Sequence, residues 1–300
     1  MTKFISILFF LAVTFLSAQE RYIDSVFSNI HVETMSYIQK DGISLDLDFY
    51  QPVKDTLSKR PLFVFVHGGG FSSGKRDHKE IVKLAYSTAS RGYAVASLSY
   101  RLTRKGKSFS CDCPASEKIE TFRAVTTDIL DALLFLVNQK EKLQIDEQRI
   151  ILAGSSAGAE GILIAAYNRE VVNADKKYAH IKPAVVVSLA GALLDIRYIT
   201  KENAVPGVFF HGTADPLVPY DSAPHHYCEQ NTPGYIMLDG SATIVKKLED
   251  LDQSFLFYSF KGAGHNIFKI PFDRMQEIYF FIDQVVNSKK LSQTRILLEK

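Results

Sequence analysis

The sequence predicts an α/β fold, in which a mostly parallel β-sheet is covered by helices on both faces. Apolar runs of strand length recur from residue 61 onward, and segments with helical spacing of apolar residues separate them. The runs are apolar throughout, which is typical of strands that are buried on both faces. The chain has 300 residues, of which 46% are hydrophobic, so it can bury one large core.

The predicted elements follow one another without a linker. Residues 31–39 and 44–53 alternate in polarity around Lys40-Asp41-Gly42, which indicates an antiparallel hairpin. Further strands are expected at 61–66, 93–100, 149–153, 183–189, 205–210 and 255–260, and helices at 77–91, 122–136, 159–167, 241–251 and 275–286. We therefore expect residues 19–300 to form a single domain.

The first residues have the layout of a secretory signal. A short basic start at residues 1–3 precedes an apolar run at 4–16, and small and polar residues follow at 17–20. We expect residues 1–18 to be a signal peptide that is cut after Ala18, and the mature protein to be secreted or periplasmic without a stable membrane anchor. The alternative is a buried N-terminal helix.

The formal net charge is +2 and the positive charges are scattered, so no nucleic acid is expected as a partner.

The three cysteines form an odd set, so at most one intramolecular disulfide can form. In an oxidising compartment Cys228 can pair with Cys111 or with Cys113, and the sequence does not decide between them. A zinc site is not favoured, because the Cys-x-Cys pair and one distant cysteine lack a fourth ligand. No metal is expected.

The most informative motif is Gly-Ser-Ser-Ala-Gly at residues 154–158. It lies between a predicted buried strand and a helix rich in small residues. A serine on such a tight turn exposes its hydroxyl at the edge of the sheet, and the neighbouring glycines avoid collisions with the adjacent strand and helix. Ser156 is therefore the candidate nucleophile, and Ser155 is a spacer.

Three further polar features also follow directly after predicted strands: the run His-Gly-Gly-Gly-Phe at 67–71, Asp215 and His265. The carboxyl ends of parallel strands meet at one edge of the sheet, where α/β proteins build their sites. A serine hydroxyl needs an imidazole to take its proton and a carboxylate to hold that imidazole. We therefore predict a triad of Ser156, Asp215 and His265, in the order expected of α/β-hydrolases.

The glycine run supplies a second requirement of acyl transfer. A tetrahedral intermediate carries an oxyanion that needs N–H groups already directed at it, and glycines let the backbone come close enough. We assign this oxyanion hole to the N–H groups of Gly69, Gly70 and Ala157. His67 is expected to support the loop through hydrogen bonds.

Other residues compete for these roles. Asp195 and Asp221 are rivals for the acid, but neither comes directly off a predicted strand. His211, His225 and His226 are rivals for the base, but the chain order favours the histidine after the last strand. Residues that can line the acyl pocket, or only pack, are Phe71, Leu217, Val218 and Ile267.

Together these motifs resemble those of α/β-hydrolase-fold serine esterases, and most of all the compact bacterial carboxylesterase/lipase-like group related to hormone-sensitive-lipase-like and feruloyl/acetyl esterase enzymes. The matching stretches are HGGGF at 67–71, SYRL at 99–102, GSSAG at 154–158, HGTADPLVP at 211–219 and GAGH at 262–265. The resemblance extends over about residues 31–287.

The resemblance implies an eight-stranded, mostly parallel sheet without a large cap domain. It also implies ester hydrolysis through an acyl-enzyme without a cofactor, on a small-molecule or polysaccharide ester with a short-chain or carbohydrate-linked group. The loops at 102–118 and 220–240 are long for this family and can form the pocket rim together. The alternatives are a serine exopeptidase of the prolyl-oligopeptidase type and a non-catalytic binding module.

Overall fold

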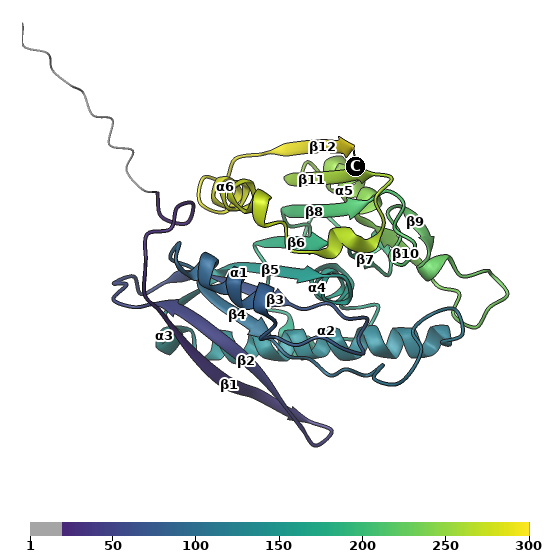
Figure 1. Cartoon of the computed structure of the whole chain (residues 1–300), viewed down its shortest axis with the longest axis horizontal. Helices are drawn as coiled ribbons and strands as arrows, with labels where there is room; N and C mark the ends of the chain where they lie inside the picture. Colours follow the sequence, from purple (N-terminus) through teal and green to yellow (C-terminus); the bar gives the residue numbers. More distant parts are fainter. Residues whose placement is uncertain (1–19, 300) are drawn as a thin grey trace, which may run out of the picture.

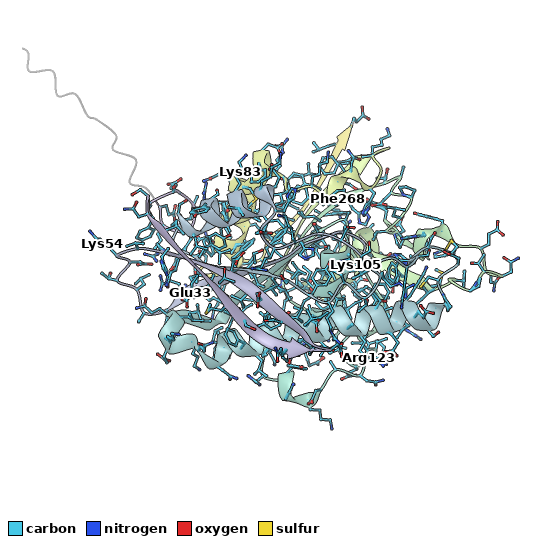
Figure 2. The ribbon with its side chains drawn as sticks, turned by 60° about the horizontal axis from the view of Figure 1, so that its bottom comes forward. Glu33, Lys54, Lys83, Lys105, Arg123 and Phe268 are labelled. Carbon is cyan, nitrogen blue, oxygen red and sulfur yellow. A yellow bond between two sulfur atoms is a disulfide. The ribbon has the colours of Figure 1, made fainter. Side chains whose placement is uncertain are left out.

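The structure is a computed structural model that describes residues 20–299. The expected signal peptide at residues 1–18 and its cut after Ala18 lie outside the described residues. Charged side chains such as Glu33, Lys54 and Arg123 lie at the outside of the molecule (Figure 2). Among residues 20–299, none of the helices combines the length and apolar character needed to cross a membrane.

Within residues 20–299 the main sheet has nine strands, in the order β1-β2-β4-β3-β5-β6-β8-β11-β12. It extends from purple β1 and β2 at one edge to yellow β12 at the other (Figure 1). The strands are β1 (Ile30–Lys40), β2 (Ile43–Pro52), β3 (Arg60–Val66), β4 (Ala94–Leu98), β5 (Ile145–Ser155), β6 (Val185–Leu189), β8 (Gly207–Gly212), β11 (Phe255–Lys261) and β12 (Gln293–Glu299). β2 is antiparallel to β1 and β4, and the other neighbours are parallel.

Helices cover both faces of this sheet. They are α1 (Lys79–Ala89), α2 (Ala115–Asn138), α3 (Lys140–Leu143), α4 (Ala157–Tyr167), α5 (Ser241–Asp250) and α6 (Met275–Val286). One apolar core joins the sheet to α2, α4 and α5, and a second joins its opposite face to α1 and α6. The central strand β3 is buried along its whole length, as its apolar sequence predicts.

A small second sheet lies beside the main one, in the order β7-β10-β9. Its strands are β7 (Ala192–Leu193), β10 (Met237–Gly240) and β9 (Ser222–Pro224). β9 and β10 bracket a loop that reaches the segment before α2, where Gly234 N–H donates to the Cys111 carbonyl oxygen at 2.9 Å.

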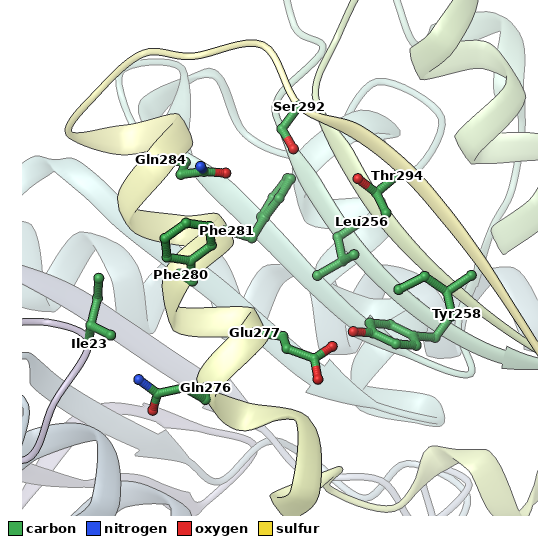
Figure 3. A pocket seen from close by; sticks show the side chains of 11 residues that line it. Ile23, Leu256, Tyr258, Gln276, Glu277, Phe280, Phe281, Gln284, Ser292 and Thr294 are labelled. Atoms are coloured by element: carbon green, nitrogen blue, oxygen red, sulfur yellow. The ribbon is translucent and has the colours of Figure 1, made fainter.

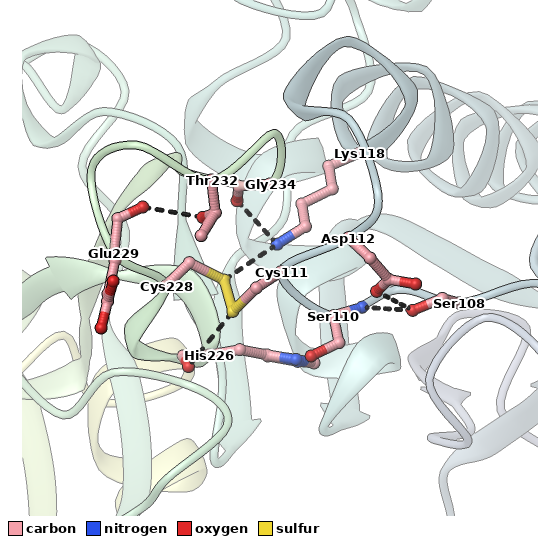
Figure 4. Close-up of a disulfide and its surroundings, with 10 residues drawn as sticks. All are labelled: Ser108, Ser110, Cys111, Asp112, Lys118, His226, Cys228, Glu229, Thr232 and Gly234. Atoms are coloured by element: carbon pink, nitrogen blue, oxygen red, sulfur yellow. Dashed lines mark hydrogen bonds between the residues drawn. A yellow bond between two sulfur atoms is a disulfide. The ribbon is translucent and has the colours of Figure 1, made fainter.

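The disulfide joins Cys111 to Cys228 (Figure 4). Cys113 is a buried free thiol. This decides the pairing that the sequence left open. The bond ties the loop before α2 to the loop between β9 and β10, so the two long loops are linked to each other.

The sequence predicts eight strands, one fewer than the nine of the main sheet, because it does not indicate β12. It lies at the sheet edge and pairs in parallel with β11 alone. Most of its side chains are exposed, including that of Leu297 at 63%. A strand that is buried so little has no continuous apolar run, so the pattern that identifies the inner strands does not detect it.

Candidate active site

Ser156 occupies a sharp turn between β5 and α4. Its backbone has φ 50° and ψ −124°, a sparsely populated conformation for a residue with a side chain. A methyl group at Gly158 would lie 2.2 Å from the Val66 carbonyl oxygen, and one at Gly154 would lie 2.6 Å from the Gly158 carbonyl oxygen. The two glycines therefore let the helix start directly against β3 and β5.

Ser156 Oγ lies 2.7 Å from His265 Nε2, and His265 Nδ1 lies 2.7 Å from Asp215 Oδ2. Asp215 follows β8, and His265 begins the 3-10 turn η4 (His265–Phe268) after β11. Because the ionised carboxylate only accepts hydrogen bonds, Nδ1 carries the proton and Nε2 is free to accept from the serine hydroxyl. The structure thus brings together the three residues that the sequence nominated from separate strands.

Asp215 is held in its charged form although it is almost completely buried. Burial works to raise the pKa of Asp215, but hydrogen bonds from His211 and His265 outweigh it and hold the pKa well below its usual range. Its other oxygen, Oδ1, accepts the backbone N–H groups of Leu217 at 2.9 Å and Val218 at 3.1 Å. The carboxylate is therefore both ionised and fixed in position.

Residues 67–71, which we call the glycine loop, lie against the candidate nucleophile Ser156. A methyl group at Gly68 would be 3.2 Å from Ser156 Cβ, and Gly69 and Gly70 have φ values of 120° and 58° that favour glycine. Among residues 20–299, no hydrogen-bond acceptor pairs with the N–H groups of Gly69, Gly70 or Ala157. The N–H of Ala157 is one of the free donors at the start of α4. All three are available to an incoming oxyanion.

His67 supports this loop from below. Its Nδ1 lies 2.7 Å from the Gly68 carbonyl oxygen, and its ring stacks on Tyr100 with ring centroids 4.4 Å apart. The Tyr100 hydroxyl donates to the His67 carbonyl oxygen at 3.0 Å. Burial lowers the pKa of His67, which favours the neutral imidazole. Tyr100 belongs to the SYRL stretch at 99–102, but its contacts with His67 become visible only in the structure.

Known proteins that are similar to part of this chain include an ester hydrolase. Residues 47–193 match the family model described as BD-FAE. Ethyl acetate hydrolase of Pseudomonas putida is 30% identical over 138 residues, which are 45% of this chain and 38% of that protein. The polyketide synthase nvfA of Aspergillus novofumigatus is 29% identical over 133 residues, which are 43% of this chain and 5% of that protein. The chain thus spans well under half the length of these two relatives.

Solved structures of esterase 2 from Thermogutta terrifontis share the fold. The apo form superposes with a TM-score of 0.61 at 19% identity, over 88% of this chain and 97% of that one. A butyrate-bound form gives a TM-score of 0.61 at 18% identity, over 87% and 95%. The chain therefore has an α/β-hydrolase fold.

The rival residues lie elsewhere or behind the three candidate residues. Asp195 forms an ion pair with Arg197 at 2.6 Å, and Asp221 is exposed. His211 is fully buried, with Nδ1 2.8 Å from Ser241 Oγ and Nε2 3.1 Å from the Val218 carbonyl oxygen. Its Nε2 also lies 3.4 Å from Asp215 Oδ2. His211 therefore packs behind Asp215, away from Ser156 Oγ, whose imidazole partner is His265.

Two buried ionisable residues near the site were not singled out from the sequence. Glu160 follows Ser156 by one helical turn, and burial, with a smaller contribution from the charge of Asp215, raises its pKa to about 8. Its Oε1 lies 3.4 Å from His225 Nε2, and it has no hydrogen-bond partner among the described residues. The sequence does contain a feature that could have identified Glu160, because it is the one charged residue in the otherwise apolar α4.

Lys118 is the second such residue. It is completely buried, and its Nζ donates to the Gly234 carbonyl oxygen at 2.9 Å and lies 3.9 Å from Cys228 Sγ (Figure 4). Burial lowers its pKa. The ammonium group joins α2 to the disulfide-linked loop, a contact between segments that are more than 100 residues apart.

The residues expected at the pocket divide into two kinds. Phe71 and Val218 are buried, while Leu217 is 40% exposed and Ile267 is partly buried against the α1–α6 core.

Within residues 20–299, no cluster of three or more His, Cys, Asp or Glu side chains could hold a metal ion.

Proposed function

We propose that this α/β-hydrolase cleaves carboxylic esters through an acyl-enzyme, with Ser156, His265 and Asp215 as its catalytic triad. The observation that carries the proposal is the continuous chain of two 2.7 Å contacts from Ser156 Oγ through His265 to Asp215. Unpaired N–H groups beside the serine and the likeness to esterases support the same reaction.

In the proposed first step, Ser156 Oγ attacks the ester carbonyl carbon while its proton passes to His265 Nε2. The N–H groups of Gly69, Gly70 and Ala157 hold the oxyanion that forms. Collapse of this intermediate breaks the bond to the alcohol oxygen, which takes the proton from His265 Nε2. Asp215 stabilises the imidazolium between these two transfers.

In the second step, water takes the place of the alcohol. His265 accepts a proton from water, the hydroxide oxygen bonds to the acyl carbon, and Ser156 leaves with the proton returned from Nε2. The products are a carboxylic acid and the free enzyme. No step draws on a cofactor.

The test is hydrolysis of p-nitrophenyl acetate by the wild type, Ser156→Ala and the matched control Ser25→Ala, whose serine is exposed and lies in the N-terminal segment. We expect kcat to fall by about 10⁴-fold or more in Ser156→Ala and to stay unchanged in Ser25→Ala. Mass spectrometry of protein quenched during turnover should locate the acetyl group on Ser156.

Two outcomes would contradict this function. Cleavage of peptidyl amides without ester turnover would favour the exopeptidase alternative. Absence of turnover by the wild type on both ester and amide substrates would favour a binding module.

We also propose that the substrates are short-chain or carbohydrate-linked esters and that the mature protein, a single domain from residue 19, is exported. The Cys111–Cys228 disulfide supports export, because such bonds persist in oxidising compartments. N-terminal sequencing of protein recovered from outside the cytoplasm should begin at Gln19, and an intact Met1 would contradict the proposed cut after Ala18.

A further inference from the structure

One cavity opens beside the candidate nucleophile. It has a volume of about 500 Å³ and shares Gly68 and Ser155 with the glycine loop and the serine turn. The apolar part of its walls consists of Phe65, Ile81, Phe268, Ile270 and Phe272, and ionisable side chains such as Lys75 and Glu80 also line it. We call it the α1-side cleft, because α1 and the segment 268–272 form its two sides. Its volume lies within the range of about 300–1,000 Å³ that is usual for small-molecule sites.

Two other cavities lie away from the triad. One of about 390 Å³ lies between α6 and the strands β11 and β12, where Phe281 and Leu256 line it (Figure 3). The other, of about 570 Å³, is lined by the end of α4 and by residues such as Tyr198. Neither shares a residue with the glycine loop or the serine turn, whereas the α1-side cleft shares residues with both.

The position of the cleft relative to His265 identifies the part of the substrate that it can hold. Phe268 lies in the same 3-10 turn as His265, and the two ring centroids are 5.3 Å apart. His265 must give its proton to the departing alcohol oxygen, so the alcohol lies on the His265 side of the carbonyl carbon. Phe268, which contacts His265, and Ser155, which precedes Ser156, both line the cleft.

We propose that the α1-side cleft binds the alcohol part of the ester and selects alcohols that carry an apolar ring. This inference rests on the proposed ester hydrolysis and adds the substrate class to it. Three phenyl rings line the cleft, and aromatic and aliphatic rings gain most from such walls. Ser155, which the sequence offers only as a spacer, forms part of the cleft wall.

The outer wall is braced across the cleft. Lys83 of α1 places its ammonium group 4.1 Å from the centre of the Phe272 ring (Figure 2 labels Lys83 and Phe268). This cation–π contact connects α1 to the segment 268–272. This contact thus joins the two walls of the cleft, and Gly68 also lines it.

The test compares ethyl, cyclohexylmethyl and 2-phenylethyl acetate, with release of acetic acid followed by titration. The acyl group is constant and the three alcohols have similar acidity, so differences in kcat/KM report how the alcohol is bound. We expect the wild type to prefer the two ring-bearing esters over ethyl acetate by about tenfold or more.

Two variants change the cleft. Ile81→Trp fills it and should reduce the ratio of kcat/KM between the ring-bearing esters and ethyl acetate to less than about threefold. Phe268→Ala removes one wall at an exposed position, so it tests the same contact with little risk to folding, and it should raise KM for the ring-bearing esters. Phe280→Ala, an exposed phenylalanine on α6, is the matched control and should change neither value.

The outcomes separate this proposal from the proposed function. Ester hydrolysis without a ring preference, or a preference that survives both Ile81→Trp and Phe268→Ala, overturns the cleft proposal. Absence of hydrolysis of all three acetates overturns the proposed function. In that case, binding of 2-phenylethanol measured by saturation-transfer NMR, and lost in Ile81→Trp, would still support the cleft as a ring-binding site.

Discussion

The two flanks of Ser156 differ in how they are filled. On the α1 side, an apolar cleft of about 500 Å³ reaches the serine turn. On the α2 side, aromatic rings pack against one another, with centroids of Phe71 and Phe109 4.9 Å apart and those of Phe109 and His225 5.3 Å apart. The proposed triad therefore lies between an open flank and a crowded flank. In our proposal the open flank takes the alcohol, so the crowded flank is left to the acyl group.

The crowded flank is also the more strongly fixed of the two. The Cys111–Cys228 bond joins its two loops, and Lys118 holds them to α2 through the Gly234 carbonyl (Figure 4). The segment 265–274 beside the open flank instead consists of two short 3-10 turns. The α2 side is crowded and cross-linked, whereas the α1 side is bordered by short turns. We therefore expect the enzyme to be more selective for the acyl group than for the alcohol.

The largest expected effect involves the residue that both flanks share. In Asp215→Asn, the amide presents an N–H group to His265 Nδ1, so the imidazole proton moves to Nε2 and the serine loses its base. We expect kcat to fall by about 10⁴-fold. The fall should be the same for p-nitrophenyl acetate and 2-phenylethyl acetate, because the triad acts on both flanks alike.

The control for this change is Asp221→Asn, at an exposed position, which should leave kcat unchanged. A loss confined to one class of ester would contradict a shared role for Asp215 and would place its effect on one flank alone.

The second prediction concerns the buried acid of the crowded flank. Burial, then the charge of Asp215, raise the pKa of Glu160 to about 8, and Lys118 opposes them; His225 lies 3.4 Å away. The unfolded chain ionises this group above its ordinary pKa of 4.5, whereas the folded protein keeps the proton until about pH 8. The stability that neutral Glu160 retains at low pH is therefore lost progressively between about pH 4.5 and pH 8.

Glu160→Gln removes this pH dependence. We expect the free energy of unfolding of the wild type to decline by on the order of 1–4 kcal/mol more than that of the variant between pH 5 and pH 8. Urea unfolding at both pH values measures it, with the exposed Glu170→Gln as control. Equal pH dependence in the wild type and Glu160→Gln would show that this flank does not hold a neutral acid.

The arrangement of the candidate site was predictable to the extent that it depends on strand ends. Ser156, Asp215 and His265 lie far apart in the chain, yet each follows an inner strand, and parallel strands place their carboxyl ends at one edge. The conformation of the serine turn follows from the adjacent glycines. These relations are local in sequence or imposed by sheet topology, so patterns in the sequence carry them.

What could not be predicted depends on contacts between distant segments. The choice of Cys111 over Cys113 as the partner of Cys228 depends on how two loops meet. The burial of Glu160 and Lys118 depends on side chains from the other elements packed around them. The cleft is formed by α1 and the segment 268–272, which are almost 200 residues apart in the chain, so neither stretch alone indicates a pocket.

The last and smallest effect tests the comparison of flanks directly. Phe109 is half-buried and contacts Phe71, Phe122 and His225 on the α2 side. With the alcohol held constant as p-nitrophenol, the wild type should prefer acetate to hexanoate. Phe109→Ala should raise kcat/KM for hexanoate by about tenfold because it opens this flank, and it should leave the preference among the three acetates unchanged. If Phe109→Ala altered the alcohol preference instead, the assignment of the two flanks would have to be reversed.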